Sequence, residues 1–348
     1  MDGDMSMRPI RFPFETPPAE GEAIEVADGI LWFRMPLPMR LDHVNCFALR
    51  DGDGWSVVDT GFASNRSREV WRKIMAGPLQ GLPIRRVIAT HHHPDHMGLA
   101  GWLQSDFGAT LLTTRTAWLF ARMLTLDAHE VQKEETLLHY RSGGMDAKIY
   151  QKRLKERPFL FSDVVAPMPL GFERLQEGQV LRMGGRDWDI RMGNGHAPEH
   201  ATFWCREEPL VLAGDQILSS ISPNIGVYAT EPEADPLEDW LEACERLSHF
   251  ATEEHLVLPG HKLPFTGLPA RMVQLIRNHH NGLERLKTFL SEERTAAECF
   301  VTLFKRPIGE GEYGLALVEA IAHLNHLYHL GAVTRTRRDD DAWLWKIA

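Results

Sequence analysis

Four histidines and one aspartate lie within the six residues from His91 to His96, in the order His-His-His-Pro-Asp-His. Imidazole and carboxylate groups are costly to bury without partners, so this density is not that of an ordinary core segment. The apolar run at 84–89 predicts a short buried strand just before it, and a helix-like stretch follows from Gly98. Because α/β proteins place ligand sites at the carboxyl ends of strands, we expect a functional site here.

The spacing of these side chains favours metal chemistry. His91 and His93 are two residues apart, so on an extended segment they project from the same side. Pro94 then turns the chain before Asp95 and His96, so one strand end can direct two imidazoles at one ion and an Asp/His pair at a neighbouring ion. Such donors suit zinc, iron, manganese or cobalt, and no cysteine lies nearby to complete a closed structural zinc site. The alternative is a polar loop whose histidines only cap and hydrogen-bond.

The segment resembles the H-x-H-x-D-H signature of the metallo-β-lactamase superfamily, and four further segments resemble the family's other motifs in the same order. These are residues 57–61 (VVDTG), 195–200 (GHAPEH), 212–215 (LAGD) and 258–261 (LPGH). The resemblance covers roughly residues 24–280. It implies an α/β fold: a four-layer αβ/βα sandwich, opened by antiparallel strands.

The same resemblance implies a ligand set for two divalent metal ions. One ion would be held by His91, His93 and His196, and the second by Asp95, His96 and His261. Asp215 would bridge the two ions. Asp59 and His200 would hold the ligand side chains in position without binding metal. Asp95 would also orient the water or transfer a proton. Zinc is favoured, while iron and manganese accept the same donors.

Two ions that share a water lower its pKa and give a hydroxide at neutral pH, which attacks a carbonyl or phosphorus. The resemblance to glyoxalase-II-like members favours hydrolysis of a thioester, ester or lactone. The chain after Asp215 lacks the tyrosine that quorum-quenching lactonases use, and Tyr228 is a weak substitute. The alternatives are a phosphodiesterase or ribonuclease of the same fold and a single-iron persulfide dioxygenase.

Composition limits the partners. The 348 residues are 43% hydrophobic, which suffices for one large domain and a smaller one. The net charge of −10 argues against nucleic acid and favours a small-molecule substrate. No apolar run approaches the roughly 18 residues of a membrane span. The four scattered cysteines predict free thiols of a reducing, cytoplasmic compartment. The composition does not decide whether the chain forms a homo-oligomer.

The order of the segments predicts three parts: an N-terminal arm at 1–20, a metallo-β-lactamase domain at 21–280 and a C-terminal domain at 281–348. Residues 116–160 form a helical insertion, broken at Gly143-Gly144, which we interpret as a lid or substrate wall, or else as a dimer face or ordinary packing. The basic cluster at 148–157 predicts either a solvated helix face or a surface that binds an acidic part of the substrate, such as coenzyme A or a carboxylate.

The C-terminal part resembles a winged-helix module. Thr295 and Glu298 have the spacing of a capping box, a long helix is expected at 315–330, and a strand-turn-strand follows. The presumed recognition helix at 312–330 contains no Lys or Arg, which favours an interaction or substrate-pocket element over a DNA-binding one. The three histidines of this helix predict a polar helix face; they are His323, His326 and His329. Asn45, within an apolar strand, predicts either a satisfied edge amide or a site residue.

Overall fold

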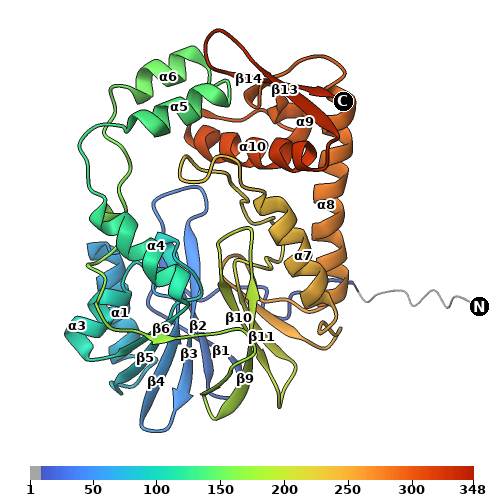
Figure 1. Ribbon diagram of the computed structural model, residues 1–348. Coiled ribbons are helices and arrows are strands. Elements are labelled where there is room, and N and C mark those ends of the chain that lie inside the picture. The colour runs from blue at the N-terminus through green and yellow to red at the C-terminus, as the bar shows by residue number, and fades with distance from the viewer. Residues whose placement is uncertain (1–8) are drawn as a thin grey trace, which may run out of the picture. The chain divides into compact units, whose positions relative to one another are not determined.

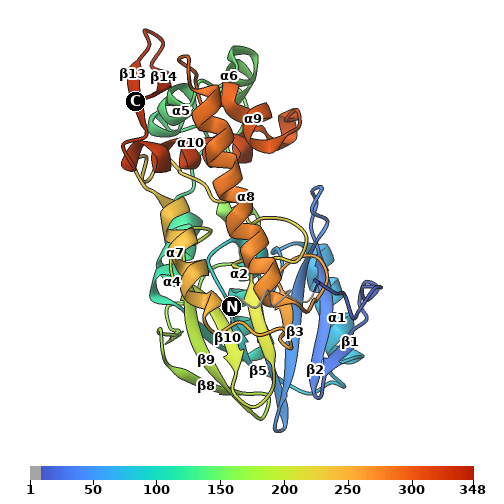
Figure 2. The same cartoon turned by 90° about the vertical axis from the view of Figure 1, so that its right-hand side faces the viewer.

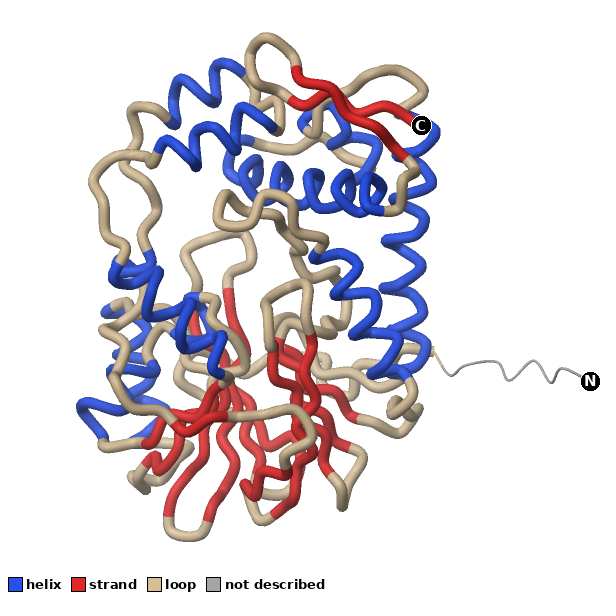
Figure 3. Tube along the Cα trace, viewed as in Figure 1, coloured by secondary structure: helices blue, strands red, loops and turns tan. Residues whose placement is uncertain are grey.

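The computed structural model describes residues 9–348, which form two compact units (Figures 1 and 3). The first unit comprises the chain up to Ala128 together with Leu160–Pro223 and Leu247–Met272. The second comprises His129–Phe159, Asn224–Arg246 and Val273–Ala348. Both units are discontinuous in sequence, and the linear boundary at 280/281 stays a prediction.

A seven-stranded sheet forms one half of the first unit, with its strands in chain order. The strands are β1 (Ile24–Ala27), β2 (Ile30–Pro36), β3 (His43–Asp51), β4 (Gly54–Val58), β5 (Ile84–Ile88), β6 (Thr110–Thr113) and β7 (Glu173–Arg174). Pairing is antiparallel from β1 to β4, because short turns join these strands, and parallel from β4 to β7. The expected antiparallel opening is confirmed.

A five-stranded sheet forms the other half, in the order β12-β11-β10-β9-β8. Its strands are β8 (Val180–Met183), β9 (Arg186–Gly193), β10 (His200–Cys205), β11 (Leu210–Gly214) and β12 (Leu256–Pro259). Only β11 and β12 pair in parallel. Figure 2 shows these yellow-green strands beside the blue strands of the first sheet.

Two apolar cores hold the first unit together. One lies between the sheets, where Trp32 and Phe47 of the first sheet share a buried cluster with Trp188 and Phe203 of the second. The other lies on the outer face of the first sheet, beneath α1 (Asn65–Ala76) and α3 (Ala100–Phe107). The Ser64 side chain caps α1, and the helix buries Val70, Trp71 and Ile74 on one side. The α/β sandwich expected from the sequence is confirmed.

The predicted functional residues lie at strand ends of this sandwich. Asp59 follows β4, His91 comes three residues after β5 ends, Asp215 follows β11, and His261 comes two residues after β12 ends. Parallel neighbouring strands end at a common edge of their sheet, so their loops meet there. The short helix α2 (Pro94–Met97) then carries Asp95 and His96. Helix α4 (Arg115–Leu126) opens the predicted insertion.

The second unit is largely helical. It contains α5 (Glu134–Ser142), α6 (Ala147–Arg153), most of α7 (Pro236–Ser248) and α8 (Leu268–Phe289), α9 (Phe300–Phe304), α10 (Tyr313–His329) and the hairpin of β13 (Val333–Arg337) and β14 (Trp343–Ile347). The backbone N–H and hydroxyl of Thr295 both donate to the Glu298 carboxylate, which confirms the capping box, although a 3₁₀ turn precedes α9. The comparison with a winged helix stays a prediction.

Helix α10 is the core of the second unit, because twelve of its 17 residues are buried. The expected polar face is therefore wrong for His323 and His326, which are buried. His323 packs against His279 of α8, and His326 contacts the Asp235 carboxylate. A helix surrounded by neighbours on most sides buries polar side chains whenever they find hydrogen-bond partners.

The N-terminal arm is described only in part, since residues 1–8 lie outside the described residues. Residues 9–20 contain no helix or regular strand, but Arg11 forms an isolated antiparallel bridge with Thr266. Within residues 9–348, no helix combines the length and apolar character that a membrane span requires.

Candidate metal centre

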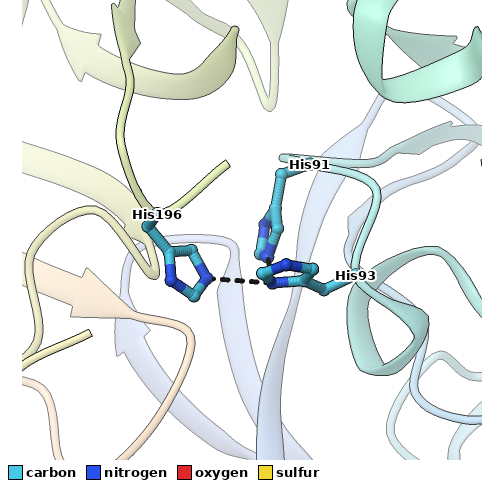
Figure 4. Close-up of side chains that lie close together, drawn as sticks. All are labelled: His91, His93 and His196. Carbon is cyan, nitrogen blue, oxygen red and sulfur yellow. Dashed lines mark hydrogen bonds between the residues drawn. The ribbon is translucent and has the colours of Figure 1, made fainter. Parts of the chain in front are cut away.

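Three imidazoles from two loops of the first unit meet at one point (Figure 4). His91 Nε2 lies 3.0 Å from His93 Nδ1, and His93 Nδ1 lies 3.0 Å from His196 Nε2. His91 and His93 belong to the loop after β5, whereas His196 lies between β9 and β10. These are the three residues predicted to hold one ion, and their ligand atoms can reach a common cation.

A second group forms beside the first. His261 Nε2 lies 3.3 Å from Asp95 Oδ2, and His96 Nε2 lies 3.6 Å from the same oxygen. Their three ligand atoms can also surround one cation. The structure thus brings together the residues predicted for the second ion.

The Asp215 carboxylate lies between the two groups. Its Oδ1 is 3.4 Å from His96 Nε2, and its Oδ2 is 3.2 Å from His261 Nε2 and 3.5 Å from His196 Nε2. One carboxylate therefore faces imidazoles of both groups, which is the arrangement that a bridging ligand needs.

The donor set fits divalent metal ions. His96 Nε2 and Asp215 Oδ1 are buried and make no hydrogen bond of acceptable geometry, although buried polar atoms are nearly always paired. Zinc–nitrogen bonds of 2.0–2.1 Å place tetrahedral ligand atoms roughly 3.3 Å apart. The distances given above between neighbouring ligand atoms run from 3.0 to 3.6 Å. Cations would therefore satisfy the atoms that the protein leaves unpaired.

Hydrogen bonds behind the site orient the imidazoles. The Thr90 hydroxyl donates to Asp59, so its lone pairs accept from His91 Nδ1, 3.0 Å away. His96 Nδ1 donates to Asp59 Oδ2, and His261 Nδ1 donates to the His43 carbonyl, each at 2.8 Å. Each ring thereby directs Nε2 toward the site, and this is the nitrogen that can bind metal.

The electrostatics also favour a cation. Burial lowers the pKa of His91 well below its ordinary value, and the neighbouring imidazoles lower it further. Burial opposes ionisation of Asp215, but His261 and His96 outweigh it and hold the pKa of this carboxyl well below its usual range. Burial opposes protonation of His96 and His261, but Asp215 and Asp95 outweigh it and raise the pKa of His96 well above its ordinary value and that of His261 to about 10. A metal ion bound at these two rings would therefore displace protons.

Asp59 supports two ligand segments at once. Its carboxylate accepts from the Thr90 backbone N–H at 2.9 Å as well as from the Thr90 hydroxyl and His96. Its backbone has φ = +61°, a conformation that aspartate and asparagine adopt more readily than most residues. The side chain thus joins the loop after β4 to the ligand loop after β5.

His200 lies directly behind the ligands. Its ring stacks on His91 with centroids 4.5 Å apart, and its Nε2 accepts from the Asp215 backbone N–H at 3.0 Å. Gly214 gives it room, because a Cβ there would lie 2.5 Å from His200 Cε1. His200 therefore positions Asp215 and His91 by packing and hydrogen bonding.

Asn45, for which the sequence allowed either a satisfied amide or a site role, connects β3 to the His261 loop. The Asn45 side chain donates to the carbonyls of Pro259 and Lys262, at 2.8 and 2.9 Å, and accepts from Trp32 Nε1 and Arg34 Nε. The edge position predicted for this amide is wrong, because β3 lies between β2 and β4. The sequence indicated this role only by the presence of one amide within an apolar strand. The two carbonyls that Asn45 binds are more than 200 residues away in the sequence.

Comparison with protein families identifies this architecture. A model of the metallo-beta-lactamase superfamily matches residues 39–261, and one of the metallo-beta-lactamase-like C-terminal domain matches residues 283–348. The chain belongs to the metallo-beta-lactamase superfamily. All seven candidate ligands lie within the first matched segment.

Solved structures of superfamily members agree. A beta-lactamase domain protein from Burkholderia ambifaria is 35% identical, covering 97% of this chain and 98% of its own, with a TM-score of 0.89. A metallo-beta-lactamase family protein from Thermus thermophilus is 27% identical, covering 93% and 100%, with a TM-score of 0.78. Among curated proteins, "Probable metallo-hydrolase YqjP" of Bacillus subtilis is 23% identical over 88% of this chain and 94% of its own.

In this superfamily member the motif at 195–200 also contacts helix α4. The backbone N–H of Thr116 donates to Glu199 Oε2 at 2.9 Å, and the Thr116 hydroxyl donates to the same oxygen. Burial opposes ionisation of Glu199, but these hydrogen bonds and nearby Arg174 lower the pKa of its carboxyl. Glu199 has φ = +48°, a conformation uncommon for residues other than glycine. Sequence reasoning gave Glu199 no role.

Proposed function

We propose that this chain is a metal-dependent hydrolase of a carboxylic acid derivative, namely a thioester, an ester or a lactone. The observation that carries the proposal is the convergence of seven imidazole and carboxylate side chains at the strand ends of the first unit. Divalent ions bound there would polarise a substrate oxygen and lower the pKa of a bound water. Two ions fit the two groups, and we favour zinc among the metals that these donors accept.

The protein side chains would divide the work. His91, His93 and His196 would hold one ion, and Asp95, His96 and His261 the other, with Asp215 shared between them. His200 and Asp59 would keep the imidazoles and Asp215 in place.

Asp95 is the candidate for proton transfer. Its side chain is 17% exposed, against 7% for Asp215, so it is the more accessible carboxylate to a water or substrate. Burial opposes ionisation, but His96 and His261 outweigh it and lower its pKa, so the group is an ionised carboxylate at neutral pH. Asp95 would take a proton from the attacking water and return it to the leaving group.

A small molecule is the proposed substrate. The acidic composition and the burial of most of α10, which carries no Lys or Arg, support a small molecule over nucleic acid. All four cysteines are buried and unbridged, which supports a reducing, cytoplasmic location.

The test is metal content together with turnover. Elemental analysis of protein purified without chelator would be paired with a panel of acyl thioesters, aryl esters, lactones, a phosphodiester and a persulfide. Zinc or manganese near two per chain, with thioester, ester or lactone hydrolysis, supports the proposal. Turnover of the phosphodiester alone, or one iron with oxygen uptake on the persulfide, contradicts it.

Variants connect any turnover to these residues. Asp215→Ala and His196→Ala are each expected to lose metal and activity together. His280→Ala removes an exposed imidazole of α8 and is the matched control, expected to retain both. Full activity in either ligand variant would exclude the proposed site.

A further inference from the structure

Helix α4 carries an apolar stripe that begins beside the loops of the candidate ligands. Residues three and four apart share a helix face, which puts Thr116, Phe120 and Met123 in one row, with Leu119 beside them. Two residues of this row, Thr116 and Phe120, contact the ligand loops. Thr116 donates to Glu199, and the Phe120 ring lies 5.0 Å from the ring of His92. The row therefore leads outward from the metal ligands.

The outer part of this row is exposed and uncharged. The side chains of Leu119 and Met123 are 50% and 47% exposed, and Leu126, one turn further, is 69% exposed. The helix carries two charged residues, Arg115 and Arg122, and Arg122 is held on the Trp118 side of the helix, where it donates to the Met168 carbonyl. Large apolar side chains gathered on one exposed face mark a binding surface more often than isolated ones do.

The opposite face of α4 is fixed. Ala117 and Ala121 are buried, Trp118 stacks on Phe172, and the Thr114 side chain caps the helix. Because the helix is anchored there and at Glu199, its exposed side chains stand at a set position relative to the ligand loops. A rigid support of this kind suits recognition of the part of a substrate next to the reacting bond.

We propose that the face of α4 formed by Leu119, Phe120 and Met123 binds the apolar acyl chain of the substrate while its carbonyl lies at the metal centre. The inference rests on the proposed hydrolase function and names its substrate class as medium-chain to long-chain acyl thioesters or esters. From Leu119 to Leu126 the face is about 10 Å long, at about 1.5 Å per residue. It begins beside the ligand loops, through the contacts of Thr116 with Glu199 and of Phe120 with His92, and this continuity favours a substrate chain as its occupant.

The experiment measures chain-length dependence. Hydrolysis of acetyl, butyryl, hexanoyl, octanoyl and decanoyl thioesters by the metal-loaded protein should show kcat/KM rising about twofold per methylene, since one side of the chain is covered and full burial gives about fourfold. The variant Leu119→Asn/Met123→Gln should flatten this rise and lower kcat/KM for the decanoyl substrate about tenfold, while acetyl turnover stays within about twofold. Both positions are exposed, so the fold should be retained.

The matched control is Leu330→Asn, which removes a leucine that is 61% exposed at the end of α10 and should leave the dependence unchanged. A wild-type rate independent of chain length, or a rise that persists in the double variant, overturns the inference while the hydrolase function stands. A change of oligomeric state in the double variant, seen by light scattering, would also overturn it, because the face would then be covered by a second copy.

Calorimetry with non-hydrolysable alkyl thioethers separates this inference from the proposed function. If no thioester, ester or lactone is hydrolysed, the proposed function fails. Affinity that increases with alkyl length in the wild type but not in Leu119→Asn/Met123→Gln still supports the apolar face. Affinity that is equal for all lengths rejects it.

Discussion

Asp59 and His96 form a buried pair in which His96 Nδ1 donates to Asp59 Oδ2 at 2.8 Å. This contact fixes which imidazole nitrogen faces the metal centre. Asp59→Asn keeps the shape and tolerates φ = +61° but replaces the anion with a neutral amide. We expect metal affinity to fall about 10- to 100-fold. Competition with a chromophoric chelator measures this, and an unchanged affinity would show that Asp59 does not orient His96.

Glu199 is expected to hold α4 against the motif at 195–200, so that its loss affects metal binding. Glu199→Ala loses the Thr116 contacts and keeps the strained φ of +48°, whereas Glu199→Gly also loses the contacts but relieves about 1 kcal/mol of strain. Chemical denaturation should therefore find Glu199→Gly more stable than Glu199→Ala. Both variants should bind metal more weakly than Glu199→Gln, which can still accept from Thr116. Equal metal affinity in all three would argue against this coupling.

Removing the Asn45 amide should destabilise the first unit. Asn45→Ala leaves the buried Trp32 indole N–H without its acceptor and the Pro259 carbonyl without this donor, whereas the Lys262 carbonyl keeps its hydrogen bond from Arg34. At about 1–3 kcal/mol for each unsatisfied group, partly relieved by water, we expect a loss of about 2–4 kcal/mol in the free energy of unfolding. Urea denaturation followed by circular dichroism tests this. Asn278→Ala, on an exposed position of α8, is the control and should change little.

Gly260 should tolerate no side chain. A Cβ there would collide with Asp215 Oδ1 and lie 2.8 Å from His96 Cε1. Gly260→Ala is therefore expected to displace the Asp215 carboxylate, the candidate bridging ligand, and to lower the metal content found by elemental analysis. Gly314→Ala is the comparison, because a Cβ at that position of α10 meets no atom within 4 Å and alanine favours helix. Wild-type metal content in Gly260→Ala would contradict the close approach of this glycine to Asp215 and His96.

Acid should destabilise the second unit through two buried histidines. His279 Nδ1 lies 3.1 Å from His323 Nε2, and burial lowers the pKa of His279 to about 3 and that of His323 to about 4. Below about pH 6.5 the unfolded chain binds protons that the folded chain excludes. The two histidines therefore do not reduce the free energy of unfolding above pH 6.5. Between pH 6.5 and pH 4 the free energy of unfolding falls by roughly 1.4 kcal/mol per pH unit for each histidine.

Urea denaturation at several pH values tests this slope. His279→Gln removes one titrating group and should reduce the loss between pH 6.5 and pH 4, whereas His280→Gln, on the exposed neighbouring position, should not. Identical slopes in the two variants would show that His279 is not the source. Because both variants retain the metal ligands, acid release of metal affects them equally.

The sequence by itself determined the strands of the α/β sandwich and, through the resemblance to the family, the seven candidate ligands. Alternating and continuous apolar runs predict strands locally, and motifs such as His91-x-His93-x-Asp95-His96 place ligands at their ends. Tertiary structure decided which atoms meet. The orientation of His261 Nε2 toward the site depends on the hydrogen bond of Nδ1 to a carbonyl of β3. Asn45 binds the carbonyls of a loop more than 200 residues away. It also decided that His323 is buried and that Glu199 contacts α4. Such contacts arise from packing between distant segments, and no local pattern of residues encodes them.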